Sequence, residues 1–135
     1  MKKLIALILS FVYILGLVGC SKDATYQSTE ITNISIRIFN ISPTGATIII
    51  KDSNEIPHTY GAWYQIEKNA NGEWHEIETV IDNYGFALVG YIPDHNGEIE
   101  FTMDWEWLYG KLPTGQYRLL KQVDNQYISI EFDIV

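Results

Sequence analysis

The sequence is poor in cysteine: among 135 residues there is one, Cys20. A single cysteine cannot form a disulfide within the chain, so the folded state cannot rely on covalent cross-links. Its stability must come from packing. The four largest side chains suited to that role are the tryptophans Trp63, Trp74, Trp105 and Trp107.

Basic residues are also scarce, with 9 lysines and arginines against 17 aspartates and glutamates and a formal net charge of −8. Proteins that bind nucleic acids or anionic membrane surfaces do so through clustered lysine and arginine. The composition therefore argues against both as partners. The excess of acidic residues favours solubility.

Long apolar runs are absent except at the N-terminus, where Leu4–Val18 follows Lys2 and Lys3. A short positive region, an apolar run and a small-residue cleavage site make up a secretory signal peptide. The run of 15 residues is shorter than the roughly 17–25 that span a bilayer. The motif Leu17-Val18-Gly19-Cys20 resembles the lipobox of bacterial lipoproteins. The resemblance implies that Cys20 is acylated and becomes the first mature residue; an uncleaved anchor and ordinary secretion are the alternatives.

These features predict three parts: a lipoprotein signal peptide over residues 1–19, a lipid-anchored tether over 20–30, and one domain over 31–135. Cleavage before Cys20 removes 19 of the 135 residues and leaves 116, enough for one domain with its own core. Lipid on Cys20 would hold the protein on the extracytoplasmic face of the cell membrane.

The clearest strand pattern runs from Glu98 to Trp107. Ile99, Phe101, Met103, Trp105 and Trp107 alternate with acidic or polar residues, which predicts one buried face and one solvated face. A turn passage follows over residues 109–115, and a further strand begins at Tyr117.

Similar signals run along the rest of the domain. Strands are expected over 34–41 (with a bulge or bend where the apolar parity changes between Ile38 and Phe39), 46–51, 60–67, 73–79, 86–92 and 128–134. Turns or loops are expected at 42–45, 52–58, 69–72, 93–97 and 124–125. No window has a helical period. The sequence therefore predicts an all-β, antiparallel sandwich of seven or eight strands.

Four blocks carry a family resemblance: Tyr60-Gly61-x-Trp63-Tyr64-x-Ile66-Glu67, Gly72-x-Trp74, Trp105-x-Trp107-Leu108-Tyr109-Gly110-x-Leu112 and Gly115-x-Tyr117-Arg118. In order and spacing they resemble a bacterial immunoglobulin-like domain family of secreted and lipid-anchored Gram-positive proteins, over about residues 33–135. The resemblance implies an immunoglobulin-like sandwich. Leu112 to Tyr117 also suggests a tyrosine corner, in which the Tyr117 hydroxyl bonds back across the turn.

Asp104 and Glu106 are the best candidates for catalysis, because glycoside hydrolysis uses two carboxylates about 5–9 Å apart. Residues two apart on a strand are roughly 7 Å apart, so the spacing is permissive. Alternation, however, puts Trp105 and Trp107 on the opposite face, where they could not hold a sugar against the acids. A solvated strand face is the better interpretation, and a hydrolase remains the third hypothesis.

The sequence offers no metal or cofactor motif. His58, His75 and His95 lie in separate segments without close ligand spacing. The run Asp94-x-Asn96-Gly97-Glu98 resembles part of a calcium loop but lacks its other ligands, so a polar turn explains it better. We therefore expect no metal, no cofactor and no enzymatic activity.

Trp63 is the best candidate for binding, because it falls on the polar side of its strand, opposite Tyr64 and Ile66. Exposed beside His58, Tyr60 and Trp74, it would stack on a sugar or anchor a protein. The alternative is that Trp63 is buried in the core.

The first functional hypothesis is therefore a non-enzymatic, lipid-anchored immunoglobulin-like module that binds an envelope protein or glycan or acts as a spacer. The second is a protease inhibitor. Some small bacterial β-sandwich proteins with a similar Leu-x-x-Gly-x-Tyr corner inhibit proteases through exposed loops, and residues 52–58 would be the inhibitory loop.

Overall fold

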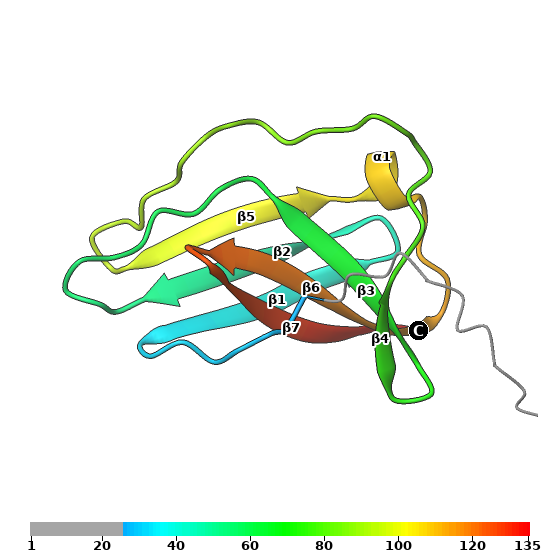
Figure 1. Ribbon diagram of the computed structural model, residues 1–135, viewed down its shortest axis with the longest axis horizontal. Helices are drawn as coiled ribbons and strands as arrows, with labels where there is room; N and C mark the ends of the chain where they lie inside the picture. The colour runs from blue at the N-terminus through cyan, green and yellow to red at the C-terminus, as the bar shows by residue number, and fades with distance from the viewer. Residues whose placement is uncertain (1–25) are drawn as a thin grey trace, which may run out of the picture.

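The computed structural model describes residues 26–135, which form two antiparallel sheets packed face to face (Figure 1). One sheet has the order β1-β2-β5, with β1 at Ile34–Ser42, β2 at Gly45–Asp52 and β5 at Glu98–Asp104. The other has the order β4-β3-β6-β7, with β3 at Tyr64–Ala70, β4 at Glu73–Glu76, β6 at Gly115–Val123 and β7 at Gln126–Ile134. The predicted immunoglobulin-like sandwich is confirmed. The signal peptide, Cys20 and the first part of the tether lie outside the described residues.

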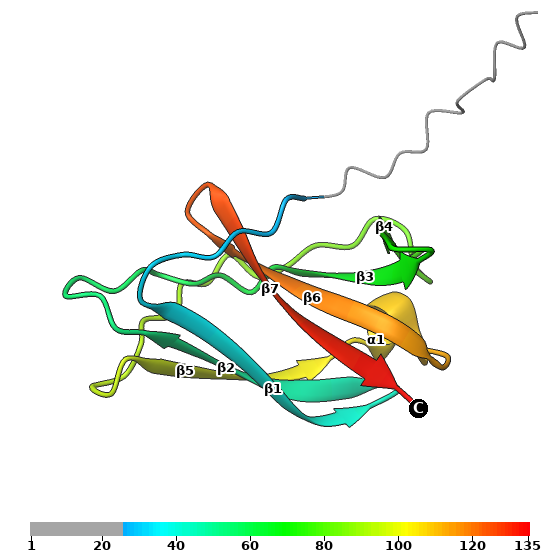
Figure 2. The ribbon, with the colours of Figure 1, turned by 90° about the horizontal axis from the view of Figure 1, so that it is seen from below.

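The core fills the space between the two sheets, which Figure 2 shows edge-on. Trp105 is fully buried at its centre, where it stacks on Phe132 and donates a 2.9 Å hydrogen bond from Nε1 to the Pro43 carbonyl. The large aromatic side chain thus buries its apolar surface while its polar atom is satisfied. The other members of the core include Ile48, Ile50, Tyr60, Ile66, Leu108, Tyr117 and Leu119.

Several local predictions are confirmed. The β3–β4 hairpin turns at Asn71 and Gly72, which both have positive φ, as a two-residue hairpin requires. Asp124 turns the β6–β7 hairpin in the same left-handed region. The β1–β2 register shifts between Phe39 and Ser42, close to the expected bulge. The shift does not turn Phe39 toward the core, however, because its side chain points outward and is 38% exposed.

The tyrosine corner is present. The Tyr117 hydroxyl donates a 2.7 Å hydrogen bond to the Pro113 carbonyl, four residues earlier, while the Tyr117 ring is fully buried. This bond ties the chain that enters β6 to the turn before it.

The prediction of a strand over Phe86–Ile92 is wrong. Residues 77–97 instead form a long irregular connection from β4 to β5, drawn in green to yellow along the upper edge of Figure 1. Between its two ends, it forms one isolated bridge among the described residues, where Tyr91 and Tyr60 exchange two hydrogen bonds. An apolar stretch becomes a strand only where a neighbouring edge pairs with it, and here that pairing ends after one residue pair.

The strand over Glu98–Trp107 was predicted too long. β5 ends at Asp104, and Glu106–Tyr109 form one helical turn, α1. Trp107 consequently leaves the buried face and is 41% exposed. The predicted strand from Tyr60 also begins later, at Tyr64.

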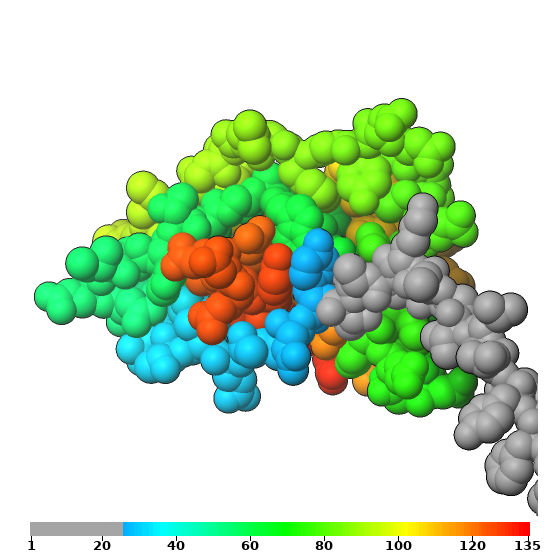
Figure 3. Space-filling model, viewed as in Figure 1, coloured from blue at the N-terminus to red at the C-terminus, as the bar shows by residue number. Residues whose placement is uncertain are grey.

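The chain joins the domain before Ile31. Thr29 donates a 2.9 Å hydrogen bond to the Tyr127 carbonyl, and Ser28 forms a parallel bridge with Tyr127. Figure 3 shows these first described residues, in blue, beside the orange β6–β7 hairpin. Among the described residues, no helix is long and apolar enough to cross a membrane.

Candidate functional site

Trp63 lies just before β3, on the outer face of the four-stranded sheet, as its alternation predicts. It is half-buried rather than core, and its ring contacts two tyrosines edge-on: Tyr26 at 5.5 Å and Tyr127 at 5.6 Å between ring centroids. Tyr26 precedes the predicted domain and Tyr127 comes from β7. Three segments that are distant in sequence thus build one aromatic cluster.

The structure does not bring together all four residues of the expected binding surface. The Tyr60 ring is fully buried, so it cannot contribute to a surface. Trp74 lies under the guanidinium of Arg118, with 4.9 Å between the Arg118 Cζ and the ring centroid. His58 lines neither of the hollows beside Trp63 and belongs to a polar network with Asp52 and Asp124. Only Trp63 keeps the predicted position beside open surface.

Trp63 separates two surface hollows. The first is polar, with a volume of about 230 Å³, and is lined by Thr59, Gly61, Trp63, Gln122 and Asp124. The Asp124 side chain is 73% exposed, so this hollow carries an accessible negative charge at the β6–β7 turn.

The second hollow is apolar, with a volume of about 500 Å³. Its walls are two short segments, residues 61–63 and 86–90. Leu88 is fully exposed and Val89 is 47% exposed. The sequence prediction missed this surface because it placed Phe86–Ile92 in a sheet. An apolar run of residues without charge was the only available signal.

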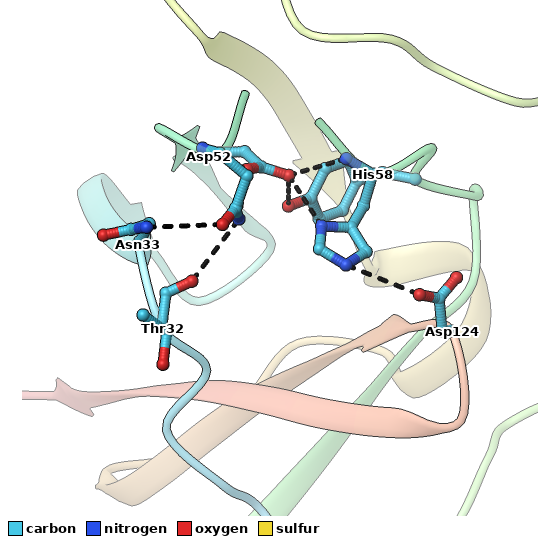
Figure 4. A network of polar contacts seen from close by, with 7 residues as sticks. Thr32, Asn33, Asp52, His58 and Asp124 are labelled. Atoms are coloured by element: carbon cyan, nitrogen blue, oxygen red, sulfur yellow. Dashed lines mark hydrogen bonds and ion pairs between the residues drawn. The ribbon is translucent and has the colours of Figure 1, made fainter. Parts of the chain in front are cut away.

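A polar network holds the loop between β2 and β3 (Figure 4). The buried Asp52 carboxylate accepts hydrogen bonds from the His58 backbone at 2.7 Å, the His58 ring at 2.9 Å, and the Tyr60 hydroxyl at 2.9 Å. Asn54 adds two more, from its backbone and its side chain. Burial alone would raise the pKa of Asp52, but the hydrogen bonds from His58 and Asn54 outweigh it and hold this pKa below its usual range.

The other ring nitrogen of His58, Nε2, lies 3.4 Å from the Asp124 carboxylate (Figure 4). His58 therefore links the base of the 52–58 loop to the β6–β7 turn. Asp124 belongs both to this link and to the polar hollow beside Trp63. The network positions one wall of that hollow.

The residues considered for chemistry have structural roles. Asp104 and Glu106 are exposed; the Asp104 carboxylate accepts a hydrogen bond from the Glu106 backbone at the start of α1. Asp94 caps a turn by accepting backbone hydrogen bonds from Asn96 and Glu98. Within residues 26–135, no three His, Cys, Asp or Glu side chains are grouped to hold a metal ion.

Comparison with known proteins adds one finding. A family model described as a bacterial Ig-like domain matches residues 28–133. The match begins at Ser28, which agrees with the contacts of Ser28 and Thr29 on β7. No curated protein and no solved structure matches the chain.

Proposed function

Because this chain belongs to the bacterial Ig-like domain family, we propose that it is a lipid-anchored, non-enzymatic binding module on the extracytoplasmic face of the cell membrane. Its ligand-binding surface is Trp63 with the two hollows on either side of it. We name this the Trp63 surface, and its ligand is a component of the cell envelope.

The single observation that carries the proposal is the placement of Trp63 between a charged hollow and an apolar one. A half-buried tryptophan held by Tyr26 and Tyr127 has few conformations to lose when a ligand covers it. Aromatic residues of this kind contribute a large share of the binding energy at protein interfaces.

The anchor rests on the motif that ends at Cys20. Tyr26 follows Cys20 by six residues, which span at most about 20 Å when fully extended. An acylated Cys20 would therefore hold the Trp63 surface close to the membrane, since Tyr26 contacts Trp63. Replacing Cys20 with serine should release the protein from the membrane fraction and abolish incorporation of labelled fatty acid.

The test of binding is retention of envelope components on the immobilised protein, wild type against Trp63→Ala. Ile56→Ala is the matched control, because Ile56 is 86% exposed and lines neither hollow. We expect a ligand that is retained by the wild type and by Ile56→Ala and lost from Trp63→Ala. Equal retention by all three proteins would rule out the Trp63 surface.

A second candidate function is protease inhibition through the 52–58 loop. One observation favours it: the loop base is held by the hydrogen bonds to Asp52, while Ile56 near its tip is 86% exposed. Inhibitory loops need this combination of a rigid base and an accessible side chain. A panel of serine and cysteine proteases tests it. Inhibition lost in Ile56→Asp and kept in Trp63→Ala would favour this function over the first.

A further inference from the structure

Close to Trp63, the segments that contain Tyr60 and Tyr91 form a single antiparallel bridge that does not continue into a ladder. Tyr60 donates to the Tyr91 carbonyl at 2.9 Å, and Tyr91 donates to the Tyr60 carbonyl at 2.7 Å. In the same antiparallel register, Ala62 would face Val89 and Trp63 would face Leu88. Instead the two segments form opposite walls of the apolar hollow.

The backbone of residues 86–90 runs beside the apolar hollow. Within the described part of the chain, no hydrogen bond involves the backbone of residues 86–90. Solvent-facing N–H and C=O groups in an extended segment are a template on which another chain can form a strand.

The side chains that line the hollow select an apolar ligand. Its lining residues are Gly61, Ala62, Trp63, Phe86, Ala87, Leu88, Val89 and Gly90. None is charged, and none has a side chain rich in donors and acceptors like those that bind sugar hydroxyls. The only extensive hydrogen-bonding capacity is in the backbone, which an acyl chain could not use. These two features together favour an extended peptide over a glycan or a lipid.

The adjoining polar hollow adds a charge preference. Asp124 lies on the other side of Trp63, with its side chain 73% exposed. The whole chain carries a net charge of −8, so a cationic partner is attracted at long range as well. A lysine or arginine of the ligand can reach Asp124 when an apolar residue of the same ligand fills the other hollow.

We propose that the Trp63 surface binds an extended peptide segment of a partner protein, with an apolar residue in the Leu88 hollow, a basic residue at Asp124, and main-chain hydrogen bonds to residues 86–90. The inference rests on the proposed function and names the class of its ligand. It predicts β-strand addition at a segment that is not a strand in the free protein.

The probe is an acetylated and amidated heptapeptide, Thr-Val-Ser-Leu-Ser-Lys-Ser, titrated into the protein purified from its expressing cells in a mild detergent. Binding is followed by the NMR signal of the Trp63 indole N–H. Two control peptides have the same sequence except for one change each. The first has glutamate in place of lysine, and the second is N-methylated at alternate peptide bonds. We expect at least fivefold weaker binding for the glutamate peptide and at least tenfold weaker binding for the N-methylated peptide.

Gly61 provides a variant that blocks the hollow without removing Trp63. An added Cβ at Gly61 has no heavy atom closer than 4.0 Å, so a side chain can begin there without a clash. Gly61 lines both hollows, and we expect the methyl groups of a valine to fill space that the ligand needs. The matched control is Gly85→Val, because Gly85 has nothing within 4 Å of an added Cβ and lines neither hollow. We expect Gly61→Val to bind at least tenfold more weakly and Gly85→Val to bind within twofold of the wild type, with unchanged thermal unfolding.

Equal binding by Gly61→Val and the wild type would overturn the proposed location. No change of the Trp63 signal at millimolar peptide, or equal binding of the N-methylated peptide, would overturn the peptide class. Chitotriose and phosphatidylcholine vesicles are titrated in parallel, and a response to either without a response to the peptide overturns it too. Retention of an envelope component that depends on Trp63, without any peptide response, would leave the proposed function standing and remove this inference alone.

Discussion

The ammonium group of Lys121 lies inside the sandwich, 2.6 Å from the Gly61 carbonyl oxygen, to which it donates a hydrogen bond. The Lys121 side chain is fully buried, and its Nζ is 4.2 Å from the centre of the Phe101 ring. Lys121 therefore ties β6 to the segment that carries Trp63. Burial lowers the pKa of Lys121 to about 8, since a charged amine is poorly solvated there.

This pKa makes stability depend on pH in a specific direction. The unfolded chain keeps Lys121 protonated up to a pKa of about 10.4, whereas the folded protein releases the proton near pH 8. Stability therefore rises with pH between these two values, because the unfolded state binds more protons. From pH 7 to pH 9.5 we expect the Lys121 contribution to the free energy of unfolding to increase by about 2 kcal/mol.

Urea unfolding of the wild type and of Lys121→Met at pH 7 and pH 9.5 measures this contribution. Burial raises the pKa values of Tyr60, Tyr64 and Tyr109, which oppose the trend at high pH, but they act equally in both proteins. The difference in stability between the two proteins should therefore shift toward the wild type by about 2 kcal/mol at the higher pH. A difference that is constant with pH would contradict a buried, charged lysine.

Replacement of Tyr117 with phenylalanine removes the hydroxyl that bonds to Pro113 and leaves the buried ring in place. Pro113 is exposed, so water can satisfy its carbonyl in the variant. We expect a loss of about 1 kcal/mol in the free energy of unfolding, the usual value for one such hydrogen bond. The control is Tyr127→Phe, whose hydroxyl donates no hydrogen bond found among the described residues. Equal destabilisation by the two variants would show that the corner bond contributes nothing.

Strand positions could be predicted where burial on one face imposes alternation. In β7, Ile128, Phe132 and Ile134 are buried as the pattern requires, and Ile130 is partly buried against the core. Hairpins at Gly72 and Asp124 could be predicted as well, because few residues adopt positive φ without cost. Alternation and turn residues are both local features, so a short segment of sequence is enough to recognise them.

The failures arise where a distant partner decides the structure. Residues 86–92 are as apolar as a buried strand, but only Tyr91 finds a pairing edge, at Tyr60. The outward direction of Trp63 followed from alternation. Its neighbours did not, since Tyr26, Tyr127 and Leu88 come from three remote segments whose approach no local pattern encodes.

Asp52→Asn should destabilise the protein and loosen the 52–58 loop. Asparagine keeps the shape of Asp52 but brings donors where the His58 backbone, the Tyr60 hydroxyl and Asn54 already donate. We expect a loss of about 2–4 kcal/mol at pH 7, typical of a disrupted buried network. Limited proteolysis should also cut the loop faster.

Acid should reduce the difference in stability between the wild type and Asp52→Asn. The pKa of Asp52 is lower in the folded protein than in the unfolded chain, where it is about 3.9. The stabilisation is therefore complete above that value and is lost as the pH falls below it. Urea unfolding at pH 6 and pH 3 should show a smaller gap between the wild type and Asp52→Asn at pH 3. A gap that widens in acid would mean that Asp52 is protonated in the folded state.

The pair of Glu67 and Arg118 gives a prediction about the outer face of the four-stranded sheet. Arg118 Nε donates a 2.6 Å hydrogen bond to the Glu67 carboxylate, which is fully buried, and Gln65 donates to the same carboxylate. Arg118→Met would leave a buried carboxylate without its cation and cost about 3–5 kcal/mol of stability. Arg118 also covers Trp74 and bonds to the Tyr26 carbonyl, so the first described residues should lose protection from hydrogen exchange.

The double variant Glu67→Met with Arg118→Met distinguishes two causes of the destabilisation: a buried Glu67 carboxylate without its cation, and the loss of the packing contacts of Arg118. Removing both partners takes away the desolvation cost together with the attraction, and buried pairs replaced in this way often lose little stability. We expect the double variant to recover at least half of the loss seen for Arg118→Met in urea unfolding. If it is as unstable as the single variant, the cost lies in the contacts of the Arg118 side chain with Trp74 and Tyr26, and the ion pair itself is dispensable.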